Sequence, residues 1–138
     1  MKIFLDTNIF LDVILKREEY YADSGRVWSL VSEKKIKGYI SAISINNIYY
    51  ILSKSIDTRL LEGFIIQLLD EFTIIPPDKE ILFKAILEDI KGYEDAIQFV
   101  SALRSGSGYL ITRNIRDFPK NKLEIIRPSS FLKKITAQ

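Results

Sequence analysis

The segment Ile3-Phe4-Leu5-Asp6-Thr7-Asn8 joins a short apolar run to three polar residues. Such a run is typical of a buried strand, and Asp, Thr and Asn are residues that follow strands and begin helices. Apolar residues then recur at helical spacing, among them Ile9, Phe10 and Val13. The segment therefore predicts a strand over residues 3–5 and an amphipathic helix directly after it.

The same alternation of strand and helix continues along the chain. Further apolar runs predict strands at residues 38–40, 72–75, 109–112 and 123–126. Helical spacing of apolar residues marks the segments between the first four strands, including a helix over residues 94–104. This alternation indicates an α/β fold in which helices cover both faces of a parallel sheet. The length of 138 residues and the hydrophobic content of 47% fit a single domain over residues 1–138.

The composition excludes several kinds of chemistry. The chain has no cysteine, which excludes disulfides, thiolate metal sites and a cysteine nucleophile. It has no histidine, which removes imidazole-based RNA cleavage, serine-type triads and most zinc enzymes. Hydrolysis would then depend on carboxylates, lysine or a hard metal ion. The net charge of +2 does not identify a nucleic-acid partner, and without a signal-peptide layout or a long apolar run a cytoplasmic protein is expected.

Acidic residues follow the expected strands, at the edge where open parallel sheets carry their functional residues. Asp6 follows the first strand, Asp117 comes after the strand at 109–112, and Asp95 opens the helix before it. If the first and fourth strands are parallel neighbours, these three carboxylates meet. Neighbouring carboxylates repel one another unless a cation is present, and Mg²⁺ or Mn²⁺ prefers oxygen ligands. The pattern predicts a Mg²⁺ or Mn²⁺ site able to activate water for phosphodiester hydrolysis.

Three ordered segments resemble the PIN domain family. They are Leu5-Asp6-Thr7-Asn8, Tyr93-Glu94-Asp95-Ala96, and Leu110-Ile111-Thr112-Arg113-Asn114 with Asp117-Phe118. Ser41-Ala42-Ile43-Ser44 extends the likeness, and the chain length resembles the stand-alone members typified by VapC toxins of toxin–antitoxin pairs. The resemblance implies a three-layer α/β/α fold with strand order 3-2-1-4-5 and Mg²⁺- or Mn²⁺-dependent endoribonuclease activity on RNA. It also implies frequent homodimers and often an antitoxin protein as a partner.

The resemblance assigns roles to individual residues. The catalytic metal ligands are expected to be the three acids Asp6, Asp95 and Asp117. Thr112 corresponds to the hydroxyl residue that helps to arrange the site. Asn47 stands where the family usually has a glutamate, and Asn114 where it commonly has an aspartate. An amide offers a metal one oxygen without a charge, so metal affinity should fall and one ion is favoured over two.

Other residues near this pattern are expected to support it. Asn114 is expected to contribute an oxygen to the metal, and Asn8, Asn47 and Glu94 to support the ligands. Two arginines flank the site and are expected to contact RNA, Arg113 and Arg116. A surface salt bridge would explain these arginines equally well.

Each acid also has a simpler structural interpretation. Asp6 could cap a helix, Asp95 could be a first-turn acid that favours the helix dipole, and Asp117 has turn character. Two other functions also stay open. The amides Asn47 and Asn114 favour a catalytically degenerate PIN fold that binds RNA or a protein without cutting. A phosphate-handling α/β enzyme, such as a receiver or a phosphatase, would also use an aspartate after its first strand.

Overall fold

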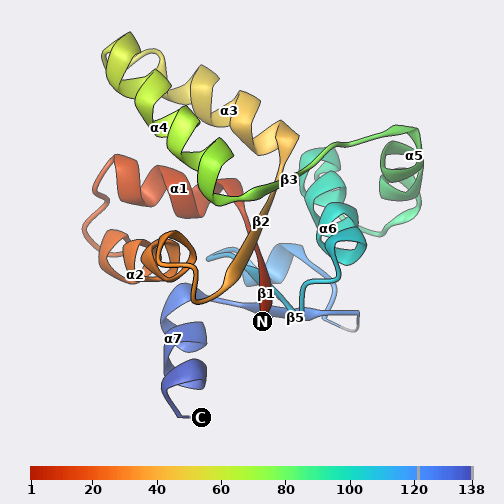
Figure 1. Cartoon of the computed structure of the whole chain (residues 1–138). Coiled ribbons are helices and arrows are strands. Elements are labelled where there is room, and N and C mark those ends of the chain that lie inside the picture. Colours follow the sequence, from red (N-terminus) through yellow and green to blue (C-terminus); the bar gives the residue numbers. More distant parts are fainter. Residues whose placement is uncertain (121, 138) are drawn as a thin grey trace.

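A five-stranded parallel sheet forms the centre of the molecule (Figure 1). The structure, a computed structural model, describes residues 1–120 and 122–137. The strands are Lys2–Leu5 (β1), Lys37–Ser41 (β2), Thr73–Ile75 (β3), Tyr109–Ile111 (β4) and Glu124–Ile126 (β5). They lie in the order β3-β2-β1-β4-β5, and each neighbouring pair is parallel. The strand order implied by the family resemblance is confirmed, and the receiver alternative is wrong because receivers have the order 2-1-3-4-5.

Helices lie on both sides of this sheet. They are Thr7–Ile14 (α1), Tyr21–Ser32 (α2), Ala42–Leu52 (α3), Thr58–Glu71 (α4), Lys79–Leu87 (α5), Tyr93–Ser105 (α6) and Pro128–Thr136 (α7), with a 3₁₀ turn at Ile115–Asp117 (η1). Figure 1 shows α1, α2 and α7 on one side of the sheet and α5 and α6 on the other, with α3 and α4 projecting as a hairpin. In the part of the chain described, no helix is long and apolar enough to cross a membrane.

Alternate residues of β1 contribute to opposite cores. Ile3 and Leu5 pack into the core formed with α1, α2 and α7, while Phe4 packs on the other face against Phe99 of α6. All three strand residues are fully buried. A strand buried on both faces needs apolar residues at every position, which explains why β1 reads as a continuous apolar run.

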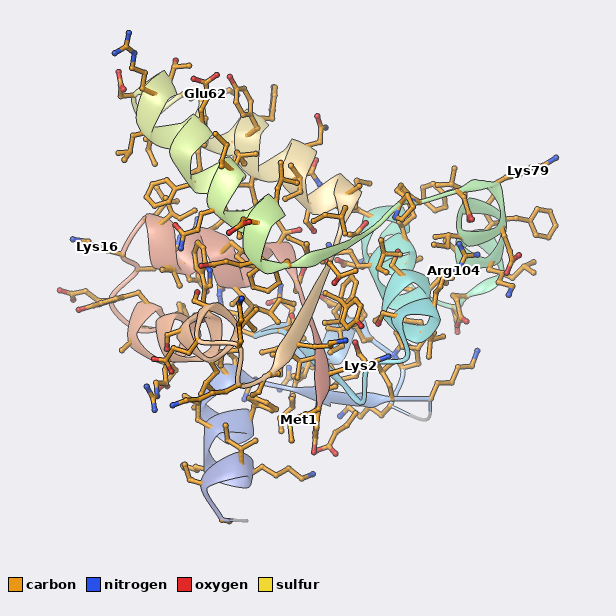
Figure 2. All side chains as sticks on the ribbon, in the orientation of Figure 1. Met1, Lys2, Lys16, Glu62, Lys79 and Arg104 are labelled. Atoms are coloured by element: carbon orange, nitrogen blue, oxygen red, sulfur yellow. The ribbon has the colours of Figure 1, made fainter. Side chains whose placement is uncertain are left out.

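The pair α5 and α6 is held together by charge as well as by apolar packing. Arg104 of α6, labelled in Figure 2, donates to Asp78 Oδ2 at 2.6 Å and lies 3.2 Å from Glu80 Oε1. Asp78 is the N-cap of α5 and accepts a hydrogen bond from the Ile81 amide. Asp78 therefore both starts α5 and anchors this helix to α6.

Two features differ from the pattern expected from the sequence. Phe72 ends α4 instead of beginning the strand at 72–75, because its backbone N–H donates to the Leu68 carbonyl at 3.0 Å. The helix α7 was not expected from the sequence. It begins with Pro128 at its first position, and its only fully buried large side chain is that of Phe131. Phe131, Leu132 and Ile135 recur at helical spacing and pack in one apolar cluster, so the pattern that marks α7 is present in the sequence but short.

Phe131→Ala is expected to lower the free energy of unfolding by about 3–4 kcal/mol, because it removes a buried ring. The ring is fully buried and contacts Tyr109 edge-on, with centroids 5.3 Å apart. Urea unfolding followed by circular dichroism measures the change. The matched control is Ile66→Ala on α4, whose side chain is 65% exposed, with an expected change below about 0.5 kcal/mol. Equal losses in the two variants would contradict this account of α7.

Candidate metal centre

Asp6 lies where β1 and β4 end side by side. Its amide donates to the Ile111 carbonyl at 3.0 Å, which continues the ladder that pairs Leu5 with Ile111. Asp6 is the N-cap of α1, but its side chain makes no capping hydrogen bond. Instead, Asp6 Oδ2 accepts a hydrogen bond of 2.8 Å from Thr112 Oγ1, 106 residues away in sequence. A helix cap therefore does not account for this carboxylate.

A buried polar network fixes the first turn of α1. Thr7 Oγ1 shares a hydrogen bond of 2.7 Å with Ser44 Oγ of α3 and accepts one of 3.3 Å from Gln98 Nε2 of α6. Gln98 Oε1 is buried and finds no hydrogen-bond partner within the described residues. No role was expected for Gln98 from the sequence, although a glutamine inside the otherwise apolar run 96–100 is the signal that could have singled it out. The network ties α1, α3 and α6 together directly behind Asp6.

Asp95 lies in the first turn of α6, whose N-cap is Gly92. Asp95 Oδ2 is 3.4 Å from the place that a Cβ would occupy on Gly92, so the carboxylate folds back over the start of the helix. Burial raises the pKa of Asp95 from 3.8 to about 6, and repulsion by Asp6, Asp117 and Glu94 adds to the shift. If Asp95 were only a first-turn acid, its pKa would be lowered instead, since a helix N-terminus stabilises negative charge.

The pKa of Asp6 is also raised, and burial is again the largest cause. The hydrogen bond from Thr112 opposes this shift, while the charge of Glu94 adds to it. Four acids from three parts of the chain thus act on one another electrostatically: Asp6, Glu94, Asp95 and Asp117. Ionising all of them together is unfavourable without a cation nearby.

The acids form an open group. Over residues 1–120 and 122–137, no three acidic side chains come close enough to enclose a metal ion, and Asp117 is exposed in η1. Over the same residues, no lysine or arginine forms an ion pair with Asp6, Asp95 or Asp117. Mg²⁺ is usually bound through one or two carboxylates while it retains several waters. Electrostatic coupling of Asp95 to Asp6 and Asp117 is the observed link among the three acids, and their binding of a metal ion stays a prediction.

The three asparagines considered from the sequence have little contact with this group. The Asn114 amide N–H donates to Thr112 Oγ1 at 3.0 Å, but the Asn114 side chain is exposed. Asn8 and Asn47 are half-buried, and the described part of the chain contains no hydrogen bond from either side chain. The structure therefore brings the backbone of Asn114 to the site and shows no contact that joins Asn8 or Asn47 to Asp6.

Arg113 makes a structural ion pair. Its Nε and Nη2 donate to the two carboxylate oxygens of Asp12 at 2.6 and 3.0 Å, and its guanidinium lies 4.3 Å from the centre of the Tyr20 ring. Asp12 is fully buried in α1 and also accepts from Arg17 at 3.0 Å. The salt-bridge interpretation of Arg113 thus describes its geometry, whereas Arg116 is exposed. Arg113 fastens the connection after β4 onto α1, next to Asn114.

Comparisons with known proteins agree on one family. A family model described as the PIN domain matches residues 2–116. The chain is 28% identical over 135 residues to Ribonuclease VapC1 of Aquifex aeolicus, and the match covers 94% of this chain and 92% of that protein.

Solved structures resemble this one over most of their length. VapBC2 from Rickettsia felis, solved with a promoter DNA fragment, superimposes with a TM-score of 0.69 at 23% identity, covering 92% of this chain and 98% of that chain. A toxin–antitoxin complex from Klebsiella pneumoniae gives a TM-score of 0.67 at 21% identity, covering 91% and 97% of the two chains. At these identities the likeness concerns the fold.

Asp95→Asn is expected to stabilise the metal-free protein at about pH 7.5, by about 1 kcal/mol after allowance for solvent screening, or roughly 2–4 °C in Tm. The pKa of Asp95 is higher in the folded chain than its ordinary value, so this group favours folding most at low pH. Its contribution is lost as pH rises from 3.8 to about 6. Thermal unfolding in a chelator at about pH 4 and about pH 7.5 should show the difference at the higher pH only.

The control for that experiment is Asp70→Asn, which changes an exposed acid of α4 and is expected to leave Tm unchanged at both pH values. Added Mg²⁺ should raise the Tm of the parent chain and remove the advantage of Asp95→Asn, because a bound cation offsets the repulsion. An equal difference in Tm between Asp95→Asn and the parent chain at both pH values in chelator would contradict the proposed repulsion.

Asp12→Asn is expected to destabilise the fold by about 2–3 kcal/mol, because two arginines lose a buried charged partner. The matched control is Glu33→Gln, since Glu33 forms an exposed ion pair of 3.3 Å with Lys35 and its loss should cost less than about 0.5 kcal/mol. Urea unfolding compares the two variants. A similar small cost in both would mean that the Asp12 ion pairs do not stabilise the fold.

Proposed function

The chain belongs to the PIN domain family, and we propose that it is a metal-dependent endoribonuclease that serves as the toxin of a toxin–antitoxin pair. The group of acids at the carboxyl edge of the sheet carries the proposal. Asp6, Asp117 and Glu94 all raise the pKa of Asp95, and no basic side chain described here pairs with the three aspartates. The relative from Aquifex aeolicus is a ribonuclease, which supports RNA as the substrate.

The oxygen donors at this edge of the sheet suggest a role for each residue in the proposed site. Asp6 and Asp95 would hold a Mg²⁺ or Mn²⁺ ion, and Asp117 and Asn114 would complete its surroundings. When bound, such an ion polarises a phosphoryl oxygen and lowers the pKa of a bound water. Thr112 donates to Asp6 Oδ2 and so holds that carboxylate in one orientation. Asp95 is ionised at neutral pH and would so present a carboxylate to the ion.

The partner proteins are part of the same proposal. The neighbours from Rickettsia felis and Klebsiella pneumoniae are toxin–antitoxin assemblies, which supports an antitoxin as a partner of this chain. A homodimer is also proposed. It is supported by an exposed apolar face on α5, where Phe83, Ile86 and Leu87 are 64%, 69% and 71% exposed. Contiguous exposed apolar residues commonly mark protein interfaces.

A second function is favoured by the two amides. Asn47 and Asn114 stand where the family usually has acids, so the site has less negative charge to hold a cation. A PIN fold that binds RNA or a protein without cutting would tolerate this loss. Chelation separates the two functions, since cleavage needs the metal and binding to the exposed arginines does not.

Asp6→Asn is expected to reduce cleavage of single-stranded RNA by at least about 100-fold in Mg²⁺ or Mn²⁺, because the substitution removes a charge from the buried ligand. Gel electrophoresis of labelled RNA measures the rate, and chelation of the parent protein should have the same effect. The matched control, Asp70→Asn, changes an exposed acid on α4 and should cleave at the parent rate. RNA that is bound but never cut by the parent protein with either metal would favour the binding module.

A further inference from the structure

Three arginines from two separate connections meet beside Asp117. A hollow of about 300 Å³ is lined by Arg113, Asn114, Arg116, Asp117 and Arg127. Arg113 and Arg116 follow β4, while Arg127 follows β5 and is the N-cap of α7. Because β4 and β5 are parallel neighbours, both connections leave the same edge of the sheet. Residues distant in sequence thus surround one space next to a proposed catalytic acid.

The guanidinium groups in this hollow are not equivalent. Arg113 directs its Nε and Nη2 to Asp12 and is largely neutralised. Arg116 and Arg127 are exposed, and no acidic side chain in the described ranges forms an ion pair with either of them. Two uncompensated guanidinium groups favour an anion with several oxygens, and planar Arg groups match phosphate geometry well.

Acidic residues around a neighbouring hollow decide on which side of Arg127 a phosphate can bind. A hollow of about 350 Å³ shares Arg113, Asn114 and Arg127 but is also lined by Glu19 and Asp23. Those two acids disfavour a phosphate on that side of Arg127. The space bounded by Arg116, Arg127 and Asp117 is therefore the better phosphate site, and it lies beside the group of acids that would act on the RNA.

We propose that Arg116 and Arg127 together bind a backbone phosphate of the RNA next to the one that is cut. The inference rests on the proposed function, because it takes RNA as the substrate, and it adds a residue with no role assigned from the sequence. Arg127 keeps its place because α7 is anchored by Phe131, whose ring is fully buried. The packing of α7 thus positions a substrate contact at the N-terminal end of this helix.

Binding and cleavage are measured separately to test the proposal. Fluorescence anisotropy of a labelled single-stranded RNA in a chelator reports binding to the folded, inactive protein. Arg116→Gln and Arg127→Gln are each expected to weaken RNA binding about 5-fold. Each should also reduce the slope of log K against log salt concentration by about 0.7 per lost phosphate contact. The matched control is Arg59→Gln, an exposed arginine at the start of α4, which should bind RNA like the parent chain. Circular dichroism confirms that each variant is folded.

The outcomes separate this inference from the proposed function. Binding by Arg127→Gln that equals binding by Arg59→Gln, with an unchanged salt dependence, would overturn the phosphate site. If the arginine variants lose RNA affinity as expected while the parent never cleaves RNA in Mg²⁺ or Mn²⁺, the phosphate site stands and the nuclease function fails. If the parent cleaves and Arg127→Gln also loses affinity, both are supported.

Discussion

The parallel pairing of β1 with β4 is the contact on which the candidate site depends. It places Leu5 opposite Ile111, so that the next residue on each strand, Asp6 and Thr112, leaves the sheet at the same edge. The Asp6 amide completes the ladder and the Thr112 hydroxyl donates to the Asp6 carboxylate. A slip of one residue in this register would turn Phe4 into the wrong core and carry Asp6 away from Thr112. Core packing and site geometry are therefore set by the same strand pairing.

Two buried aspartates of the same region show how stability and function differ. Asp12 is fully buried, and Arg17 and Arg113 neutralise it with three hydrogen bonds. Asp6 is 3% exposed, the groups that lower its pKa by hydrogen bonding (Thr112, Thr7 and Gln98) are all neutral, and burial raises its pKa. A buried charge without a partner is costly, so a group chosen only for stability would resemble Asp12. The contrast supports the proposed role of Asp6 as a metal ligand.

Much of the fold could be predicted because strand patterns and turn residues are local. The apolar runs at residues 3–5 and 109–112 located β1 and β4, and the rule that parallel sheets carry sites at one edge pointed to Asp6, Asp95 and Asp117, whose role as metal ligands stays a prediction. The pairing of Arg113 with Asp12 could not be predicted, since the two residues are 101 positions apart and Asp12 looks like any polar residue of an amphipathic helix. Arg127 was missed for a related reason. Its importance comes from the shape of a hollow formed by two connections, and no periodic pattern encodes that shape.

The two amides, Asn47 and Asn114, change the balance between stability and cation binding. Burial is the largest cause of the raised pKa of Asp95, which is about 6, and the charges of Asp6, Asp117 and Glu94 add to the shift. Asn114 keeps its backbone contact with Thr112 while it adds no charge. The same loss of charge weakens the attraction for a divalent ion and leaves too few carboxylates to hold two ions closely. Within the proposed nuclease, this smaller negative charge favours a single bound ion over two.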